Sequence, residues 1–216
     1  ISSSQTGETG AVARGLLIEA GARVTDIGNA GAIVAQVNGS SGQAIAVQDL
    51  SGTVASIENL KSITALVTPV DTTLTDTGQA IAIDVRANTS GVFIQQKGLA
   101  DIVSGDGKTD TDGDGVSDSN EPSITGQILL GSGADRIEAL NGTIAGDIAF
   151  GAGANSLLVD GGAAVKGRLT AEGGTLGLAV GSGKLTMANP AALNLTSLSL
   201  GAGSTLILAA DPEAGT

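Results

Sequence analysis

The chain has 216 residues, a formal net charge of −12, 34 glycines and two aromatic residues, and it contains neither cysteine nor histidine. Without His and Cys it has no Ser–His–Asp triad, no Cys–His pair and no zinc site of the usual ligands. Negative charge argues against nucleic acid and anionic lipid, and the absence of Trp and Tyr removes stacking platforms for sugars or bases. No apolar run approaches the roughly 18 residues of a membrane helix, so direct membrane insertion is not expected.

Residues 1–100 contain a loose repeat. Ile27 and Ile33 recur thirty residues later as Ile57 and Ile63, and the word Gly-Gln-Ala-Ile-Ala at 42–46 returns unchanged at 78–82.

The chain starts without Met or a charged-then-apolar leader, and its last residues carry no stop or cap signal. We therefore expect both ends to be cuts in a larger protein.

Residues 101–122 are acidic and carry the one specific motif of the chain. Segment 110–121 reads Asp-Thr-Asp-Gly-Asp-Gly-Val-Ser-Asp-Ser-Asn-Glu, which fits positions 1, 3, 5, 6, 9 and 12 of a twelve-residue calcium loop. Alternate carboxylates on a tight loop supply the hard oxygens that Ca²⁺ prefers. The expected ligands are the side chains of Asp110, Asp112, Asp114, Asp118 and Glu121 and the backbone carbonyl of Val116.

The alternative interpretation of this segment is a solvated acidic linker, because a run of like charges usually repels itself into disorder. An EF-hand is excluded, since Pro122 and a strand-like segment from Ile124 to Leu130 follow the motif where a helix is required. The segment separates the looser repeat from a tighter one, so the ion is expected to stiffen a hinge.

Residues 123–216 contain repeats of about 20 residues. Ile124, Ile144 and Val165 occupy one position of the repeat at steps of 20 and 21, and Ile128, Ile148 and Leu169 occupy another. Each triplet is predicted to form an interior ladder.

Apolar alternation within each copy predicts short strands with one buried face, as in Leu176, Leu178 and Val180, and again in Leu198 and Leu200. Three short strands in a repeated unit form one coil of a parallel β-solenoid, whose coils must stack because none buries its own apolar face. The length predicts about ten coils. A β-sandwich is the rival fold, but it gives no reason for a 20-residue repeat.

The passage Ile144 to Val180 and the segment from Leu193 to Leu206 resemble the passenger region of bacterial autotransporters. The resemblance implies a right-handed parallel β-helix, export by the Sec route, and display at the cell surface through an outer-membrane β-barrel that lies beyond Thr216.

The tandem Asp-Gly pattern of 105–110 and 113–118 resembles thrombospondin type 3 repeats, which implies calcium binding. A calcium nonapeptide roll is a weaker match, because the partial motif Gly131 to Ile137 recurs after 20 residues rather than nine.

The sequence thus predicts a non-enzymatic structural, display or adhesive module of an extracellular bacterial surface protein, stiffened by Ca²⁺. The alternative is a self-assembling, calcium-dependent surface-layer or filament protein that associates through its solenoid ends. A polysaccharide-cleaving enzyme is the remote alternative, with Asp135, Arg136, Asp147 and Arg168 on one face. The expected partner is a surface ligand of unknown identity or another copy of the chain.

Overall fold

The computed structural model describes residues 1–6, 10–71, 73, 75, 77–188 and 193–209. The described residues form strands and turns, without a helix, in three sheets. Sheet A contains, in spatial order, β1 (Ser2–Thr6), β4 (Ala32–Asn38), β7 (Ser62–Thr68), β10 (Ser123–Thr125), β13 (Thr143–Ala145), β16 (Ala164–Gly167), β19 (Lys184–Ala188) and β21 (Thr205–Ala209).

The other two sheets follow the same order along the chain. Sheet B contains β2 (Ala11–Ile18), β5 (Gly42–Asp49), β8 (Gln79–Asp84), β11 (Gln127–Leu129), β14 (Ile148–Phe150) and β17 (Leu169–Ala171). Sheet C contains β3 (Asp26–Asn29), β6 (Ser56–Asn59), β9 (Phe93–Gln96), β12 (Arg136–Ala139), β15 (Gly153–Val159), β18 (Gly174–Val180) and β20 (Leu195–Leu200).

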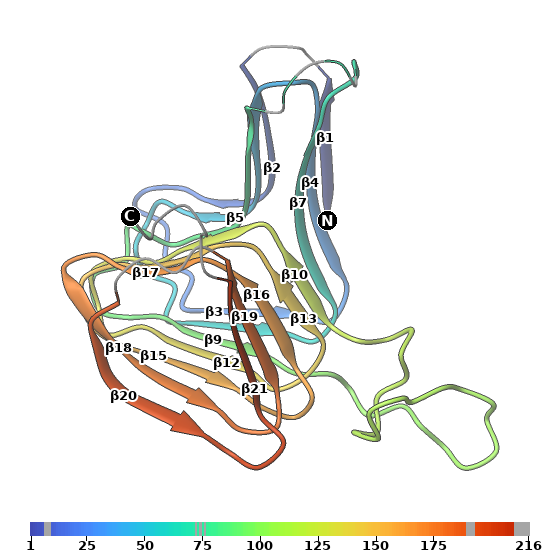
Figure 1. The fold of residues 1–216 in the computed structure, drawn as a ribbon. Helices are drawn as coiled ribbons and strands as arrows, with labels where there is room; N and C mark the ends of the chain where they lie inside the picture. The colour runs from blue at the N-terminus through green and yellow to red at the C-terminus, as the bar shows by residue number, and fades with distance from the viewer. Residues whose placement is uncertain (7–9, 72, 74, 76, 189–192, 210–216) are drawn as a thin grey trace.

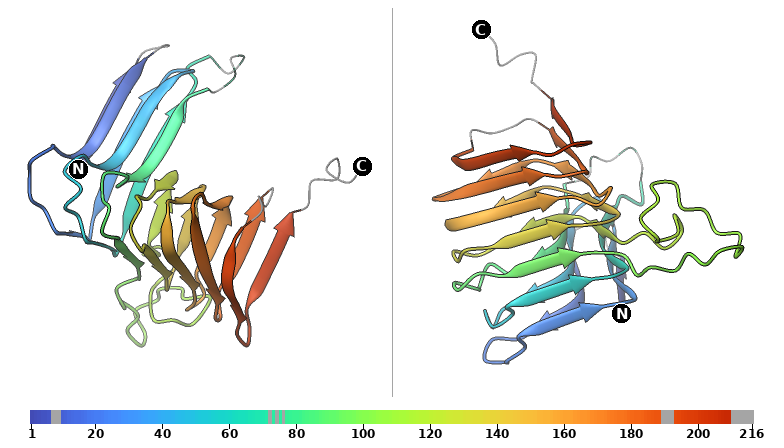
Figure 2. Two further views of the ribbon diagram at one scale, coloured as in Figure 1. Left: turned by 90° about the vertical axis from the view of Figure 1, so that its left-hand side faces the viewer. Right: turned by 90° about the horizontal axis from the view of Figure 1, so that it is seen from below.

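From β1 to β19 the chain visits sheets A, B and C in turn, so each strand from β1 to β16 pairs in parallel with the strand three places later (Figure 1). Figure 2 shows the strands stacked in sequence order from blue to red. Parallel strands need crossover connections, and here the other two sheets provide them. The architecture is therefore all-β with three parallel sheets, consistent with the predicted β-solenoid.

The two predicted interior ladders are confirmed. Ile144 pairs with Ile124 on one side and Val165 on the other in sheet A. Ile148 pairs in the same way with Ile128 and Leu169 in sheet B. All of these side chains are at most 1% exposed, and they belong to one hydrophobic cluster that draws on all three sheets.

The loose N-terminal repeat is also confirmed as a structural repeat, because Ile27 pairs with Ile57 and Ile33 with Ile63. Its greater length comes from sheets A and B. Strands β4 and β5 have 7 and 8 residues, whereas β10 and β11 have 3 each. In Figure 1 the long strands of the first coils stand out from the body. Because the longer strands use more residues per coil, the expected number of ten coils is wrong. Sheet A, the largest, holds eight strands in the described residues.

Coils approach closely at the corner between sheets A and B. Gly146 has φ +152°, and a Cβ added to it would lie 2.1 Å from the carbonyl oxygen of Gly126 in the preceding coil. Gly167 stands in the same relation to Gly146. Only glycine fits so close an approach of two backbones, which explains why this residue recurs with the repeat.

A polar ladder fills the corner between sheets C and A in the first coils. Asn29, Asn59 and Gln96 are 6%, 0% and 0% exposed and stand in register. Asn29 Nδ2 donates to Asn59 Oδ1 at 2.8 Å, and Asn59 Nδ2 donates to Gln96 Oε1 at 3.2 Å. Gln96 Nε2 then donates to the carbonyl of Asn141 at 2.9 Å. Buried amides are thereby satisfied by the next coil, and the ladder leads to the turn between β12 and β13.

The sequence prediction of a buried face is wrong for β20. Leu195, Leu198 and Leu200 are 39%, 51% and 53% exposed, although they stand in register with the buried apolar residues of β18. Their alternation would bury them only under a further strand, and β20 is the edge of sheet C in the described chain.

Shortening a ladder side chain should destabilise the whole stack. Ile144→Ala is expected to lower the free energy of unfolding by about 3 kcal/mol, because it opens a cavity between Ile124 and Val165. Thr143→Ala, at the exposed neighbouring position, should change it by less than about 0.5 kcal/mol. Urea unfolding followed by circular dichroism measures both, and equal effects would contradict the buried ladder.

Candidate metal centre

The acidic segment connects β9 to β10 and projects from the body as an extended loop (Figure 1). Lys61, in the turn between β6 and β7, donates from Nζ to Asn120 Oδ1 at 2.6 Å and to the carbonyl of Ser119 at 3.2 Å. Val116 is 3% exposed, and a Cβ added to Gly98 would lie 2.5 Å from its Cγ2. The loop is thus anchored to the body by the ammonium group of Lys61 and by the buried apolar side chain of Val116.

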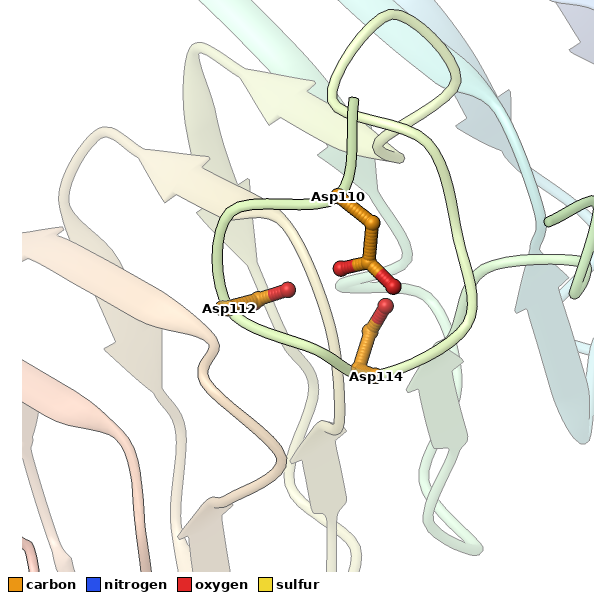
Figure 3. A group of neighbouring side chains, drawn as sticks. All are labelled: Asp110, Asp112 and Asp114. Carbon is orange, nitrogen blue, oxygen red and sulfur yellow. The ribbon is translucent and has the colours of Figure 1, made fainter. Parts of the chain in front are cut away.

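Three of the predicted ligands converge within the loop. Asp110, Asp112 and Asp114 each offer one carboxylate oxygen, and these oxygens lie within 4.8 Å of one another. Figure 3 shows the three side chains turned towards a common space inside the loop. Their alternate spacing produces this convergence, because the chain curls around them through Gly113 and Gly115, whose φ angles are +78° and +92°.

Backbone amides fix the orientation of these carboxylates. Asp110 accepts from the N–H of Gly113 at 2.7 Å through Oδ1 and from the N–H of Gly115 at 3.0 Å through Oδ2. Asp114 Oδ1 accepts from the N–H of Val116 at 2.8 Å. Such turns are formed by Asp side chains that bind their own following backbone, and here they leave the acids side by side.

Asp118 is engaged elsewhere in the loop. Its Oδ1 accepts from the N–H of Thr111 at 2.8 Å, and its Oδ2 accepts from the Thr111 hydroxyl at 2.7 Å. These hydrogen bonds, the hydroxyl first, lower the pKa of Asp118. Asp118 is one of the six predicted ligand residues. It therefore pairs with Thr111 within the loop and does not join the three convergent acids.

Glu121 faces the acidic cluster from the end of the loop. Its Oε2 is buried and has no hydrogen-bond partner. Burial, followed by repulsion from Asp114, Asp112, Asp118 and Asp110, raises the pKa of Glu121 to about 7. A buried carboxylate among like charges is unfavourable without a compensating cation.

A cavity of about 250 Å³ lies where the loop meets the body, lined in part by Asp112, Asp118, Glu121, Gly142 and Gly162. A Cβ added to Gly162 would lie 2.5 Å from Asp112 Oδ2, so the β15–β16 turn packs against this carboxylate. Burial, and then the charge of Asp114, raise the pKa of Asp112. Carboxylate oxygens of this density suit a hard divalent cation.

One residue at the cluster was not predicted from the sequence. Asn141, in the turn between β12 and β13, is 3% exposed, and its Nδ2 donates to Asp114 Oδ2. Its Oδ1 is buried without a hydrogen-bond partner. Asn141 lies 27 positions from Asp114 and outside the motif, so no local spacing pointed to it.

The acids upstream of the motif have a different arrangement. Asp101 accepts from the N–H of Ser117 at 2.7 Å, from Asn120 Nδ2 at 2.5 Å and from Lys108 Nζ at 2.8 Å. The bond from Lys108, the largest cause, and those from Ser117 and Asn120 lower the pKa of Asp101. Asp106 accepts from the N–H groups of Val103 and Lys108. Both acids thus hold the loop in shape.

The four residues considered for polysaccharide cleavage do not form one set. Asp135 is 1% exposed and accepts from the N–H of Val92 inside the corner between sheets B and C. Arg136 pairs with Glu138 on sheet C, whereas Asp147 lies 4.0 Å from Arg168 at the other side of sheet B. The expectation that they line one face is wrong, because a corner position turns Asp135 inwards.

The described residues thus define an all-β protein of three parallel sheets that carries one convergent acidic triad in a loop. No protein-family model, curated protein or solved structure matches the chain. Among the described residues there is no helix of the length and apolarity needed to cross a membrane.

Without divalent cations, stability should fall as the pH rises. The folded protein holds the Glu121 proton up to about pH 7, whereas the unfolded chain releases it near 4.5. The folded state therefore binds more protons in this window, and the free energy of unfolding decreases from pH 5 to pH 8. The raised pKa of Asp112 acts in the same direction.

Glu121→Gln should reduce this decline, since a neutral amide has no charge to repel the four Asp side chains. Circular dichroism during urea unfolding in a chelator, at pH 5 and pH 8, gives the difference between the two proteins. Asp135, whose pKa burial raises, contributes equally to both and cancels. A pH dependence identical in the variant would overturn the assignment to Glu121.

Proposed function

We propose that this chain is a non-enzymatic structural, display or adhesive module built as a closed, right-handed parallel β-helix. The observation that carries the proposal is the register of buried apolar ladders in all three sheets, from β2 to β19. Right-handedness is supported by the strong preference of parallel crossover connections for that hand. A stack of this kind is a stiff spacer that holds other parts of a protein at a distance.

The acidic loop is the calcium-dependent part of the proposed module. Asp110, Asp112 and Asp114 converge, and Glu121 places a buried, unpartnered oxygen beside them. A divalent cation at their centre relieves the mutual repulsion, so binding and ordering of the loop are coupled. Ca²⁺ is favoured over Mg²⁺, because a flexible loop with a bidentate Glu suits seven oxygens better than a strict octahedron.

The proposed location is the bacterial cell surface, with the chain as part of an autotransporter passenger anchored through an outer-membrane barrel. Its support is the likeness of segments 144–180 and 193–206 to such passengers, together with a loop that resembles thrombospondin type 3 repeats. Extracellular calcium is abundant, and extracellular modules bind it with dissociation constants of about 10⁻⁴ to 10⁻³ M. The partner is a surface ligand or a second copy of the chain.

Calorimetry on the full chain tests the metal site. The wild type should bind one Ca²⁺, and Asp114→Ala should weaken the binding at least about tenfold, because a convergent ligand is lost. Glu172→Ala removes the same charge at an exposed position outside the loop and should leave the affinity within about twofold. Chelation should loosen the loop while the coils persist.

Two results would count against this site. Equal calcium binding by wild type and Asp114→Ala would place the ion elsewhere. Complete loss of the circular dichroism of the strands on chelation would show that the ion holds the whole fold and not the loop.

A second candidate function is self-assembly through the coil ends, favoured by the apolar surface at β20 and β21. Leu198, Leu200 and Leu208 are 51%, 53% and 57% exposed there. Both strands are edges of their sheets in the described chain, so their backbone groups are available for pairing. Stacking of one molecule on another along the coil axis would give a filament.

Substitution at this end distinguishes assembly from a monomeric spacer. Sedimentation velocity should show a wild-type species that grows with concentration, and Leu198→Lys with Leu208→Lys should abolish the growth through charge at the contact. Leu66→Lys, at a 40% exposed position on β7, is the matched control and should still associate. A wild type that stays monomeric at high concentration would favour the spacer.

A further inference from the structure

We infer that Asn141 is a ligand of the cation, so that the metal centre is composed of the loop and of the β12–β13 turn of the body. The inference rests on the proposed calcium function and adds a residue that no loop motif contains. Its starting point is a buried side-chain amide that lacks one hydrogen bond. Asn141 is 3% exposed, and its Oδ1 has no hydrogen-bond partner. A buried polar oxygen without a partner is unfavourable and uncommon in folded proteins.

The amide lies against the convergent acids. Asn141 Nδ2 contacts Asp114 Oδ2, and a Cβ added to Gly98 would lie 2.8 Å from the same nitrogen. Rotation about the Cβ–Cγ bond exchanges the amide nitrogen and oxygen in nearly the same space. Without an ion, the N–H₂ group faces the Asp114 carboxylate. With a cation beside Asp114, the exchanged orientation directs Oδ1 to the ion and gives that oxygen its partner.

The loop alone leaves a ligand position open. Both carboxylate oxygens of Asp118 accept hydrogen bonds from Thr111, so this acid stabilises the loop instead of facing the triad. Three Asp oxygens, the Val116 carbonyl and a bidentate Glu121 would make six ligands, and Ca²⁺ takes six to eight. The Asn141 oxygen supplies a seventh without adding negative charge to a crowded cluster.

The location of Asn141 gives the ion a mechanical role. Its carbonyl accepts from Gln96 Nε2 at 2.9 Å, so the backbone of this turn is held by the polar ladder of the preceding coils. A cation shared by Asp114 and Asn141 would therefore join the loop to the stacked body. The loop would be clamped by its metal, in addition to the contacts of Lys61 and Val116.

Calcium titrations of the full-length variants test the ligand assignment. Asn141→Leu keeps the approximate size of the side chain, removes the oxygen and should weaken calcium binding at least about tenfold. Asn141→Asp places oxygens at both amide positions and should bind at least as tightly as the wild type. Asn155→Leu, which alters another buried corner asparagine at 4% exposure, is the matched control and should retain the affinity.

Nuclear magnetic resonance gives a second measurement, in which the effect of Ca²⁺ is observed on the wild-type protein itself. The side-chain amide signals of Asn141, assigned by their loss in Asn141→Asp, should shift on saturation with Ca²⁺, whereas those of Asn155 should not. Coordination through Oδ1 polarises the amide and moves its nitrogen and proton resonances.

The outcomes separate this inference from the proposed function. A wild type that binds no Ca²⁺ would overturn both. Wild-type binding that is lost in Asp114→Ala but retained in Asn141→Leu, with unmoved Asn141 amide signals, would overturn only the ligand role. Equal weakening by Asn141→Leu and Asn141→Asp would also overturn it, because the amide would then act as a hydrogen-bond donor.

Discussion

The structure depends on the parallel stacking of coils that cannot bury their own apolar faces. A ladder such as Ile63, Ile124, Ile144 and Val165 removes each side chain from water only because the next coil covers it. The narrow interior accepts small aliphatic residues, and the closest backbone contacts accept only glycine. A chain with 34 glycines and two aromatic residues fits both demands.

The same stacking decides where a long insertion is tolerated. The acidic loop projects from the stacked coils after β9, where the ladder of Asn29, Asn59 and Gln96 ends. Strand β9 nevertheless pairs directly with β12. Gln96 donates to the carbonyls of Asn141 and Thr143, so the next coil continues across the insertion. The loop is therefore free to carry charge without interrupting the core, and its polar cluster lies against the side of a rigid stack.

Sequence and structure agree best where neighbours in space repeat one another in sequence. The 20-residue recurrence predicted the ladders correctly, because parallel in-register stacking places equal positions of successive repeats together. The expected number of coils was wrong, because the length of a repeat depends on how far its strands in sheets A and B extend. Longer strands in the first coils use more residues per coil, so the chain forms fewer coils. The leucines of β20 show a related limit: alternation indicates which face is apolar, and burial requires a neighbour to cover it.

The sequence by itself determined the all-β class, the interior ladders and the convergence of Asp110, Asp112 and Asp114, because strand periodicity and loop spacing act over short stretches of chain. Only the tertiary structure decided that Asp118 binds Thr111, that Glu121 is partly buried beside four acids, and that Asn141 stands at Asp114. These relations depend on how the loop packs against turns of other coils. They join residues that do not occupy equal positions of successive repeats, so neither the repeat nor the loop motif marks them in the sequence.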